Sequence, residues 1–347
     1  MQKKVDYLIV GQGLVGTLLA YFLLREKQEV FIINADIPGA SSVHSSGIIN
    51  PITGRRFAKS WRIDTFLPFA KKTYKALEQL LQQDLIEEVD FCKIINSTKD
   101  ENDLSIDMGA SEYLPYFPKQ EKVYLDPTHF ETPNGGYIIK EGLRLDTSLL
   151  LKTFKQYLQA KDNYKEEEFN YSVLDIENSS YKNISFDKII FCQGFTNVNN
   201  PYFKHIPITP NKGEYLIIRT KQAHQLKYTI TSNGIISPIS DVLCYIGATY
   251  EWVGVDLSIT DKATKHLRDV FENVCKMPYD IVSQGVGIRP AIQVRKPILG
   301  VHPDYPNMAM INGMGTKGTM LAPYFTHQLM QYLVYGFLLE EEVSIKK

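Results

Sequence analysis

Six residues near the start of the chain, Gly11-Gln12-Gly13-Leu14-Val15-Gly16, have the types and the spacing to hold a pyrophosphate. In a G-x-G-x-x-G motif the first glycine allows a tight turn, the second lets phosphates approach the backbone, and the third allows close packing of helix on strand. Free N–H groups and the positive dipole end of the following helix favour the phosphate charge. The motif predicts a dinucleotide site that includes Gly11, Gly13, Leu14, Val15 and Gly16.

The elements expected around this motif are the ones that position it. Residues 5–10 form a short apolar, β-branched run typical of a buried strand, a helix is expected from Leu14 to about Arg25, and residues 30–33 form a second strand. Such sites usually carry Asp or Glu after the second strand for the ribose hydroxyls, whereas this chain has Asn34. An amide oxygen can still accept, so we expect Asn34 and Ala35 to contact the nucleotide. No Arg is nearby for a 2′-phosphate, which argues against NADP.

The composition limits the kinds of partner and ligand that we expect for this chain. The chain has 347 residues with 38 Lys+Arg against 39 Asp+Glu, a net charge of -1 that gives no reason to expect nucleic acid or an anionic membrane. The 4 cysteines form no C-x-x-C pair, so we expect no metal site and no disulfide framework. No uninterrupted apolar run approaches the ~20 residues needed to span a bilayer. We therefore expect a cytoplasmic protein, and the sequence leaves its oligomeric state open.

Three further segments favour FAD over NAD. A loop of small polar residues, 41–51, follows the second strand at once, where an NAD dehydrogenase is expected to continue with regular βαβ units. Residues 188–194 indicate another buried strand that ends in glycine, and residues 310–323 indicate a strand, a glycine-rich turn and the start of a helix. The residues expected to contact FAD in these segments are Ser41, Ser42, His44, Gly47, Gln193, Gly194, Gly313, Gly315, Thr316, Lys317, Gly318 and Thr319.

This constellation resembles the D-amino acid oxidase-like family of flavoproteins, which includes glycine oxidase, sarcosine oxidase and dimethylglycine dehydrogenase. The resemblance covers most of the chain, with little of it in residues 61–140. Its most specific part is the G-x-R-P element Gly287-Ile288-Arg289-Pro290, followed by a Pro-x-x-Gly strand at residues 297–300 and the glycine-rich turn at 313–318. Residues 246–251 and 313–318 also resemble the flavin half of the bifunctional enzyme that modifies the tRNA wobble uridine, whose methyltransferase half has no counterpart in this sequence.

The resemblance implies roles for Arg289 and Lys317. Arg289 would hold the substrate carboxylate through two parallel charge-assisted hydrogen bonds; a structural ion pair with an acidic residue is the alternative. The backbone N–H groups at residues 317–319 would open a helix against the flavin pyrimidine edge. A helix N-terminus favours an anion there by roughly 0.3–2 kcal/mol. The Lys317 ammonium would add charge, unless it points to solvent.

Further residues are candidates for contacts around the FAD. His44 stands where some relatives attach FAD covalently; we expect non-covalent FAD with the ring near the isoalloxazine, and a covalent link is the alternative. Tyr250 is a candidate for the pocket wall, together with Tyr215 and Tyr245. A strand near residues 171–174 should pass the adenine, with the backbone of Val173 as the contact.

The predicted fold class is α/β: a Rossmann-type, glutathione-reductase-like FAD-binding domain with an interleaved antiparallel-sheet α+β substrate domain. The FAD-binding domain would comprise residues 1–60, 142–200 and 284–347, and the substrate domain residues 61–141 and 201–283. Within the substrate domain we expect a helix at 65–83 and strands at 228–236 and 242–250. Residues 162–168 indicate a solvated charge run, and Arg55 and Arg56 either face the site or form a basic surface turn.

The resemblance implies an FAD-dependent oxidoreductase that oxidises the C–N bond of a small amino acid or secondary amine. Hydride would pass to flavin N5, water would hydrolyse the imine, and O₂ or another acceptor would take the electrons. One alternative is an oxidase of carboxymethylaminomethyl uridine in tRNA, against which the neutral net charge counts. Others are a 2-hydroxy acid dehydrogenase, for which His44 is the candidate base, and a flavin-binding protein without catalysis.

Overall fold

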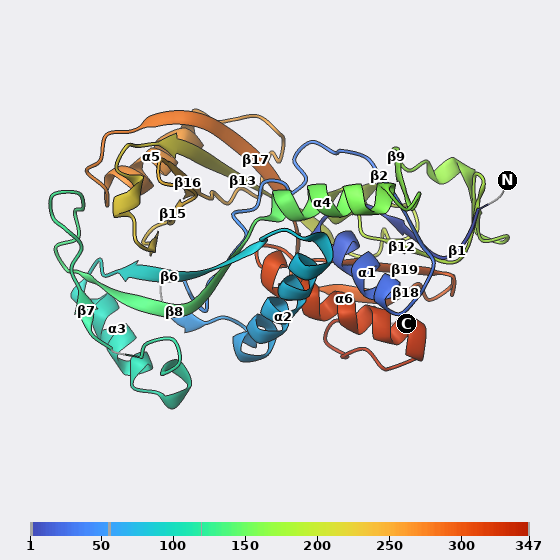
Figure 1. The fold of residues 1–347 in the computed structure, drawn as a ribbon, viewed down its shortest axis with the longest axis horizontal. Helices are drawn as coiled ribbons and strands as arrows, with labels where there is room; N and C mark the ends of the chain where they lie inside the picture. Colours follow the sequence, from blue (N-terminus) through green and yellow to red (C-terminus); the bar gives the residue numbers. More distant parts are fainter. Residues whose placement is uncertain (1–2, 55–56, 119, 346–347) are drawn as a thin grey trace.

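The computed structural model describes residues 3–54, 57–118 and 120–345, and two β-sheets dominate it. In Figure 1 the sheet that contains β1 and β12 lies to the right, and the second sheet lies to the left, beside α5 (Asp261–Glu272). The chain passes between the two sheets several times. Segments far apart in the sequence therefore meet where the sheets adjoin.

The first sheet has eight strands, and its centre is parallel. The order is β10-β11-β12-β1-β2-β9, and β19 pairs with both β12 and β18. β12, β1, β2 and β9 run parallel to one another, as expected for strands whose crossovers carry helices. The strands are β1 (Lys3–Val10), β2 (Val30–Asn34), β9 (Tyr164–Glu166), β10 (Leu174–Asp175), β11 (Ser180–Tyr181), β12 (Ile184–Phe191), β18 (Ile298–Val301) and β19 (Met308–Asn312).

Four helices pack beside this sheet. They are α1 (Leu14–Arg25), α2 (Ile63–Leu81), α4 (Thr147–Gln159) and α6 (Gly318–Tyr335). α1 is apolar on nearly every side because it is covered by the sheet and by α6, and Leu18, Leu19 and Leu23 are fully buried. Each such side chain stabilises the fold by roughly 1.5–3 kcal/mol. The burial fixes the N-terminus of α1 directly after β1, where the glycine motif turns.

The second sheet has nine strands in the order β17-β13-β16-β15-β14-β6-β8-β3, with β7 paired to β8. Its pairs are antiparallel except β14 with β6. α5 covers one face, where Leu267 and Phe271 pack on Leu216 and Ile218. The strands are β3 (Ile48–Ile49), β6 (Ile86–Ile94), β7 (Lys122–Val123), β8 (Gly136–Leu145), β13 (Ile208–Arg219), β14 (Thr229–Thr231), β15 (Ile235–Pro238), β16 (Leu243–Gly247) and β17 (Asp280–Ile292).

The predicted fold class is confirmed: a Rossmann-type parallel sheet is interleaved with a mainly antiparallel second sheet. α1 has the predicted bounds, and the helix expected at 65–83 is α2, beginning two residues earlier. The strand expected at 228–236 is instead a hairpin of β14 and β15, because the chain turns at Ser232–Gly234. The remaining helix, α3 (Thr98–Met108), and the small β4 (Ile52–Thr53) and β5 (Ala58–Lys59) pair lie outside both sheets.

Two elements pack against the domain other than the one to which the sequence assigned them. β17 pairs with β13 along its whole length in the second sheet, although we assigned residues from 284 onward to the FAD-binding domain. α2 packs on α6 beside the first sheet, although we assigned it to the substrate domain. The division into two domains remains a prediction. In the part of the chain that the structure describes, no helix has the length and apolar character to cross a membrane.

Candidate active site

A cavity of about 1370 Å³ lies where the two sheets adjoin. Its walls come from the β1–α1 turn, the segment after β2, the middle of β13 and of β17, the end of β16, and the turn before α6. Pockets for small ligands are typically about 300–1,000 Å³. The cavity is therefore large enough for a dinucleotide and a second small molecule.

The glycine turn forms one end of this cavity and has the tight geometry that the motif predicts. Gly11 has φ +101°, and a Cβ added to it would lie 2.6 Å from the carbonyl oxygen of Cys192. A Cβ on Gly16 would lie 1.9 Å from the carbonyl oxygen of Gly11. Neither position therefore accepts a side chain without displacing β1, β12 or α1.

Some backbone N–H groups of this turn have a protein acceptor and others have none among the described residues. Gln12 N–H donates to Asn34 Oδ1 at 2.7 Å and Leu14 N–H donates to Ser42 Oγ at 3.1 Å. The N–H groups of Gly13 and Val15 have no acceptor among the residues that the structure describes. α1 has no side-chain N-cap and no acidic residue in its first turn. The N-terminus of α1 can therefore bind a phosphate.

The side-chain amide of Asn34 already makes two hydrogen bonds within the protein, one of them to this turn. Its Oδ1 accepts from Gln12, and its Nδ2 donates to the Tyr164 hydroxyl at 3.2 Å. The ribose contact that we predicted for Asn34 would thus have to share an amide that already has two protein partners. Tyr164 lies on β9, which is the strand next to β2.

A second helix N-terminus also lines the cavity. α6 begins at Gly318 without a side-chain N-cap, and the N–H groups of Gly318 and Thr319 have no acceptor within the described ranges. The Lys317 ammonium donates to Ser60 Oγ at 3.3 Å rather than pointing into bulk solvent. Burial lowers the pKa of Lys317 from its ordinary value. Within the part of the chain that the structure describes, no carboxylate pairs with Lys317, so a cation and a helix N-terminus share this end of the cavity.

Arg289 is mostly buried in the wall formed by β17, and its partners are neutral. Its Nη1 donates to Asn211 Oδ1 at 2.7 Å and to the carbonyl oxygen of Thr249 at 3.0 Å. The guanidinium lies 4.5 Å from the ring centroid of Tyr250. No acidic side chain of the described residues pairs with it, so the structural ion pair considered above is absent. Burial lowers the pKa of Arg289 from its ordinary value.

His44 and two tyrosines form the neighbouring wall. His44 Nδ1 lies 3.0 Å from the Tyr215 hydroxyl, and the Tyr215 ring stacks on the Tyr245 ring at 5.1 Å between centroids. Burial lowers the pKa of the His44 imidazole, so it is neutral at pH 7. Gly287 lies directly beneath His44, because a Cβ there would come within 2.9 Å of the His44 Cβ.

Most of the predicted site residues line this one cavity. Around it the structure brings together Gly11, Gly13, Leu14, Val15, Asn34, Ala35, Ser41, Ser42, His44, Gln193, Gly194, Tyr250, Arg289, Gly315, Thr316, Lys317, Gly318 and Thr319. Gly194 and Gly315 both have positive φ, and a Cβ added at either would meet no protein atom within 4 Å. The space beside these two glycines fits a bound group.

Four predicted contacts lie outside the cavity wall. Gly16 and Gly313 lie behind it, in the packing of α1 and of β17. Gly47 is packed on the backbone of β8, since a Cβ there would lie 1.8 Å from the carbonyl oxygen of Leu145. Val173 ends a short 3₁₀ turn and is 41% exposed. Residues 171–173 thus form a turn where we expected a strand, the strand beside β2 is another one, and the adenine contact of Val173 remains a prediction.

That strand is β9, in the segment we predicted to be a solvated charge run. Ile32 pairs with Tyr164 and Asn34 pairs with Glu166, so the residues that follow β9 reach the nucleotide end of the cavity. Glu167 and Phe169 line it there. Tyr164 is buried whereas Lys165 and Glu166 are exposed, and this single aromatic residue within the charge run was the available signal for a strand. Arg55 and Arg56 lie outside the described residues.

Sequence reasoning missed the residues that hold Arg289. Asn211 faces Arg289 directly across the β13–β17 pair, and Thr249 follows the end of β16. Gly213 makes room for the guanidinium, because a Cβ there would lie 2.3 Å from Nη2. A glycine two residues from a polar side chain within a long strand was the available signal.

A Rossmann-type sheet that binds a dinucleotide at a glycine turn, covered by a second sheet with a buried cation, defines the class of two-sheet flavoproteins. Comparison with protein families places the chain within that class. A family model described as DAO, FAD dependent oxidoreductase, matches residues 6–331. The chain belongs to this DAO family and is an FAD-dependent oxidoreductase.

Known relatives support the assignment. Glycine oxidase from Bacillus licheniformis is 21% identical over 97% of this chain and 94% of its own length. The structure of glycine oxidase from Geobacillus kaustophilus superposes with a TM-score of 0.77 at 16% identity, covering 99% of both chains. Iminodiacetate oxidase from Chelativorans sp. BNC1 gives a TM-score of 0.73 at 19% identity, covering 98% of both chains. At these identities the structural matches show a shared fold.

Proposed function

We propose that this enzyme oxidises the C–N bond of a small amino acid or secondary amine that carries a carboxylate. The observation that carries the proposal is the Arg289 guanidinium, which lines the cavity with two neutral acceptors and, among the described residues, no carboxylate partner. A buried, uncompensated cation is costly unless a ligand pairs with it. A substrate carboxylate would make the two parallel charge-assisted bonds that a guanidinium favours.

Bound FAD would supply the redox chemistry by accepting, at N5, the hydride from the carbon next to the amine. The N-terminus of α1 would hold the pyrophosphate through the N–H groups of Gly13 and Val15. The N-terminus of α6 and Lys317 would face the pyrimidine edge and favour negative charge there. Water would then hydrolyse the imine, and O₂ or another acceptor would take up the electrons.

The cations around the cavity would also set the protonation state of the substrate amine. Only an unprotonated amine has the lone pair that stabilises the developing imine. Arg289 and Lys317 disfavour a further positive charge nearby, which lowers the pKa of a bound ammonium group. His44 adds no charge at pH 7, because burial lowers its pKa. The substrates named for the relatives, glycine and iminodiacetate, are amines with a carboxylate, in agreement with the proposal.

An anaerobic screen tests the proposal. The FAD-loaded enzyme is mixed with amino acids, N-methyl and N-carboxymethyl amino acids, and 2-hydroxy acids, and the loss of flavin absorbance is followed. We expect bleaching by at least one carboxylate-bearing amine and by no 2-hydroxy acid. Bleaching by hydroxy acids alone would assign His44 as a base in C–O oxidation, and bleaching only by tRNA with carboxymethylaminomethyl uridine would make that RNA the substrate. A flavin that none of these reduces would contradict catalysis at this site.

A further inference from the structure

The segment between β16 and α5, residues 248–260, controls the surroundings of Arg289. We call this segment the strap. It supplies the carbonyl oxygen of Thr249, which accepts from Arg289 Nη1 at 3.0 Å, and the Tyr250 ring, 4.5 Å from the guanidinium. Two of the three protein contacts that orient the guanidinium therefore come from the strap, and the third is Asn211 on β13.

The first part of the strap is held by the backbone of β13. Lys212 and Glu251 exchange two N–H···O=C hydrogen bonds, each 2.9 Å long. Thr249 N–H donates to the carbonyl oxygen of Glu214 at 3.0 Å, and Glu214 N–H donates to Thr249 Oγ1 at 2.9 Å. Residues 212–214 thus continue the sheet ladder beyond the end of β16.

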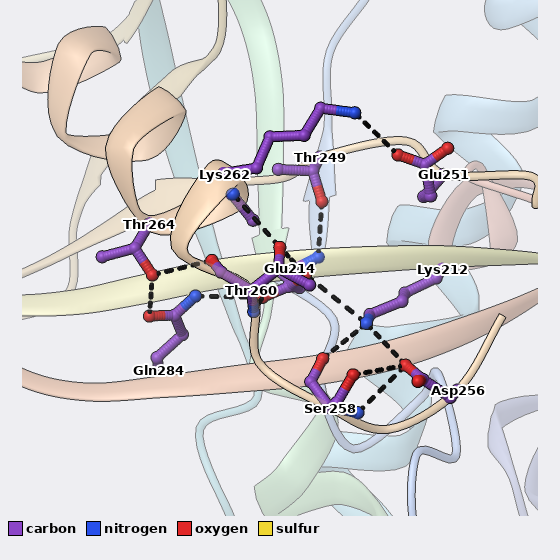
Figure 2. Close-up of polar contacts among 11 residues, drawn as sticks. Lys212, Glu214, Thr249, Glu251, Asp256, Ser258, Thr260, Lys262, Thr264 and Gln284 are labelled. Atoms are coloured by element: carbon purple, nitrogen blue, oxygen red, sulfur yellow. Dashed lines mark hydrogen bonds and ion pairs between the residues drawn. The ribbon is translucent and has the colours of Figure 1, made fainter. Parts of the chain in front are cut away.

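The last part of the strap is held by the side chains of the same two β13 residues (Figure 2). Lys212 Nζ pairs with Asp256 Oδ1 at 2.8 Å and also donates to the carbonyl oxygen of Ser258. Glu214 accepts from the N–H of Thr260 at 3.0 Å and from its hydroxyl at 2.9 Å. Gln284 Nε2 donates to the same carboxylate at 3.0 Å.

The middle of the strap has little other support. Val253 is 81% exposed and Trp252 is 52% exposed, so these apolar side chains do not anchor it in the core. Lys212 and Glu214, by contrast, are each 3% exposed, and their charged atoms lie 3.5 Å apart. Burying two charges is costly, and apolar residues of similar size often stabilise a fold as well or better. Stability alone therefore does not account for this pair, whereas the fixed position of the strap does.

We propose that Lys212 and Glu214 are positioning residues for carboxylate recognition. By fixing both ends of the strap they hold Thr249 and Tyr250 where these orient the guanidinium, and they thereby set the affinity for the substrate carboxylate through Arg289. The inference rests on the proposed role of Arg289. It assigns no step of the reaction to either residue.

The test measures carboxylate binding separately from turnover. Acetate is titrated into the FAD-loaded enzyme, and the perturbation of flavin absorbance gives its Kd. We expect Lys212→Met to raise the Kd for acetate about tenfold, while FAD remains bound and kcat for the amine substrate changes less than twofold. Lys262→Met is the matched control: its ammonium pairs with Glu251 of the same strap at 3.2 Å but is 87% exposed, and we expect no change in Kd.

A double-mutant cycle separates positioning from a general structural defect. In an Arg289→Leu background, Lys212→Met should change the Kd for acetate less than twofold, because the residue through which it acts is gone. An undiminished effect in that background, or an unchanged Kd in the single variant, would overturn the proposal. If Lys212→Met does not fold, the same double-mutant cycle is measured with Asp256→Asn, which changes a partly exposed partner of Lys212. Acetate is not oxidised, so this titration tests carboxylate binding alone. A negative result in it is therefore distinct from a negative result in the amine screen, which tests the proposed reaction.

Discussion

At the scale of single residues, the main feature of the cavity wall is the Arg289 guanidinium, which pairs with no carboxylate among the residues that the structure describes. Arg289 has an amide oxygen, a backbone carbonyl and a tyrosine ring as partners, all of them neutral. Neutral acceptors hold a guanidinium in place without satisfying its charge. The same contacts that fix its geometry therefore leave its affinity for a carboxylate intact.

Replacing Arg289 by Leu should weaken the binding of any carboxylate substrate. A hydrogen bond to a charged group contributes about 1.5–3 kcal/mol, which corresponds to a roughly 10- to 150-fold rise in KM. Steady-state kinetics with the best amine from the screen gives this number. The carboxamide analogue of that amine is the control, since its KM should not rise. An unchanged KM for the acid would remove Arg289 from the substrate site.

A second residue-scale prediction concerns pH and His44. Burial lowers the pKa of folded His44, whereas in the unfolded chain it returns to about 6.5. Between these two values the unfolded chain binds more protons, so the free energy of unfolding rises with pH up to about 6.5 and falls as the pH drops below it. His44→Asn removes this titration and can still bond to Tyr215.

Thermal denaturation at saturating FAD from pH 7.5 to 5.5 measures the effect. We expect Tm to fall less steeply in His44→Asn than in the parent enzyme across this range. His224→Asn is the control, because His224 is exposed, and its Tm should follow that of the parent. Parallel curves for His44→Asn and the parent would show that protonation of His44 does not oppose folding.

At the scale of elements, the sequence predicts best where one local pattern fixes both structure and role. The apolar strand, the glycine motif and the apolar helix predicted α1 at its observed bounds, because these three patterns are consecutive in the sequence and Gly16 packs on Gly11 within the motif itself. The G-x-R-P element likewise located Arg289. The resemblance to a known family, rather than periodicity, supplied the role of that arginine.

Prediction failed where the deciding contact lies far away in the chain. β9 was taken for a charged surface run because only its pairing with β2 shows that Tyr164 is buried. Residues 171–173 were expected to form a strand for the same reason, and they form a 3₁₀ turn. Asn211 and Thr249 could not be assigned to Arg289 because their proximity depends on the register of β13 with β17 and on the path of the strap.

Gly213 offers a test of how closely the β13 strand fits the guanidinium. A Cβ there would lie 2.3 Å from Nη2 and 2.6 Å from Cζ of Arg289. The guanidinium is the mobile end of a long side chain, so Gly213→Ala should displace it rather than unfold the protein, and Ala in place of Gly favours the strand by roughly 0.5–1 kcal/mol. We expect an unchanged or higher Tm together with an acetate Kd raised about tenfold.

The control for this variant is Gly109→Ala, which adds the same methyl group where the nearest atom would be 3.5 Å away. Its acetate Kd should equal that of the parent enzyme. If Gly213→Ala binds acetate as tightly as the parent, the guanidinium has room to move without loss of its carboxylate geometry. The fit between β13 and Arg289 would then carry no specificity.

At the scale of the whole molecule, the cavity belongs to no single stretch of chain. Gly11, His44, Gln193, Arg289 and Lys317 line it from five separate segments. The two sheets adjoin at this cavity. The N-termini of helices α1 and α6 both line it with N–H groups that have no acceptor among the described residues. A cofactor that satisfies both helix ends at once would therefore hold the two sides of the cavity together.

This arrangement predicts that FAD stabilises the folded chain well beyond what its nucleotide half can do alone. A ligand that binds only the folded state at 100 times its Kd adds roughly 2.7 kcal/mol. Each kcal/mol raises Tm by roughly 2–4 °C for chains of about 150–250 residues and by less for longer chains, so saturating FAD should raise Tm by a few degrees. ADP occupies only the α1 side and should bind more weakly, so at the same ligand concentration it should give a clearly smaller rise in Tm. Gly16→Ala, whose Cβ would lie 1.9 Å from Gly11, should abolish both effects. Equal stabilisation by ADP and FAD would show that the α6 side of the cavity takes no part in binding the cofactor.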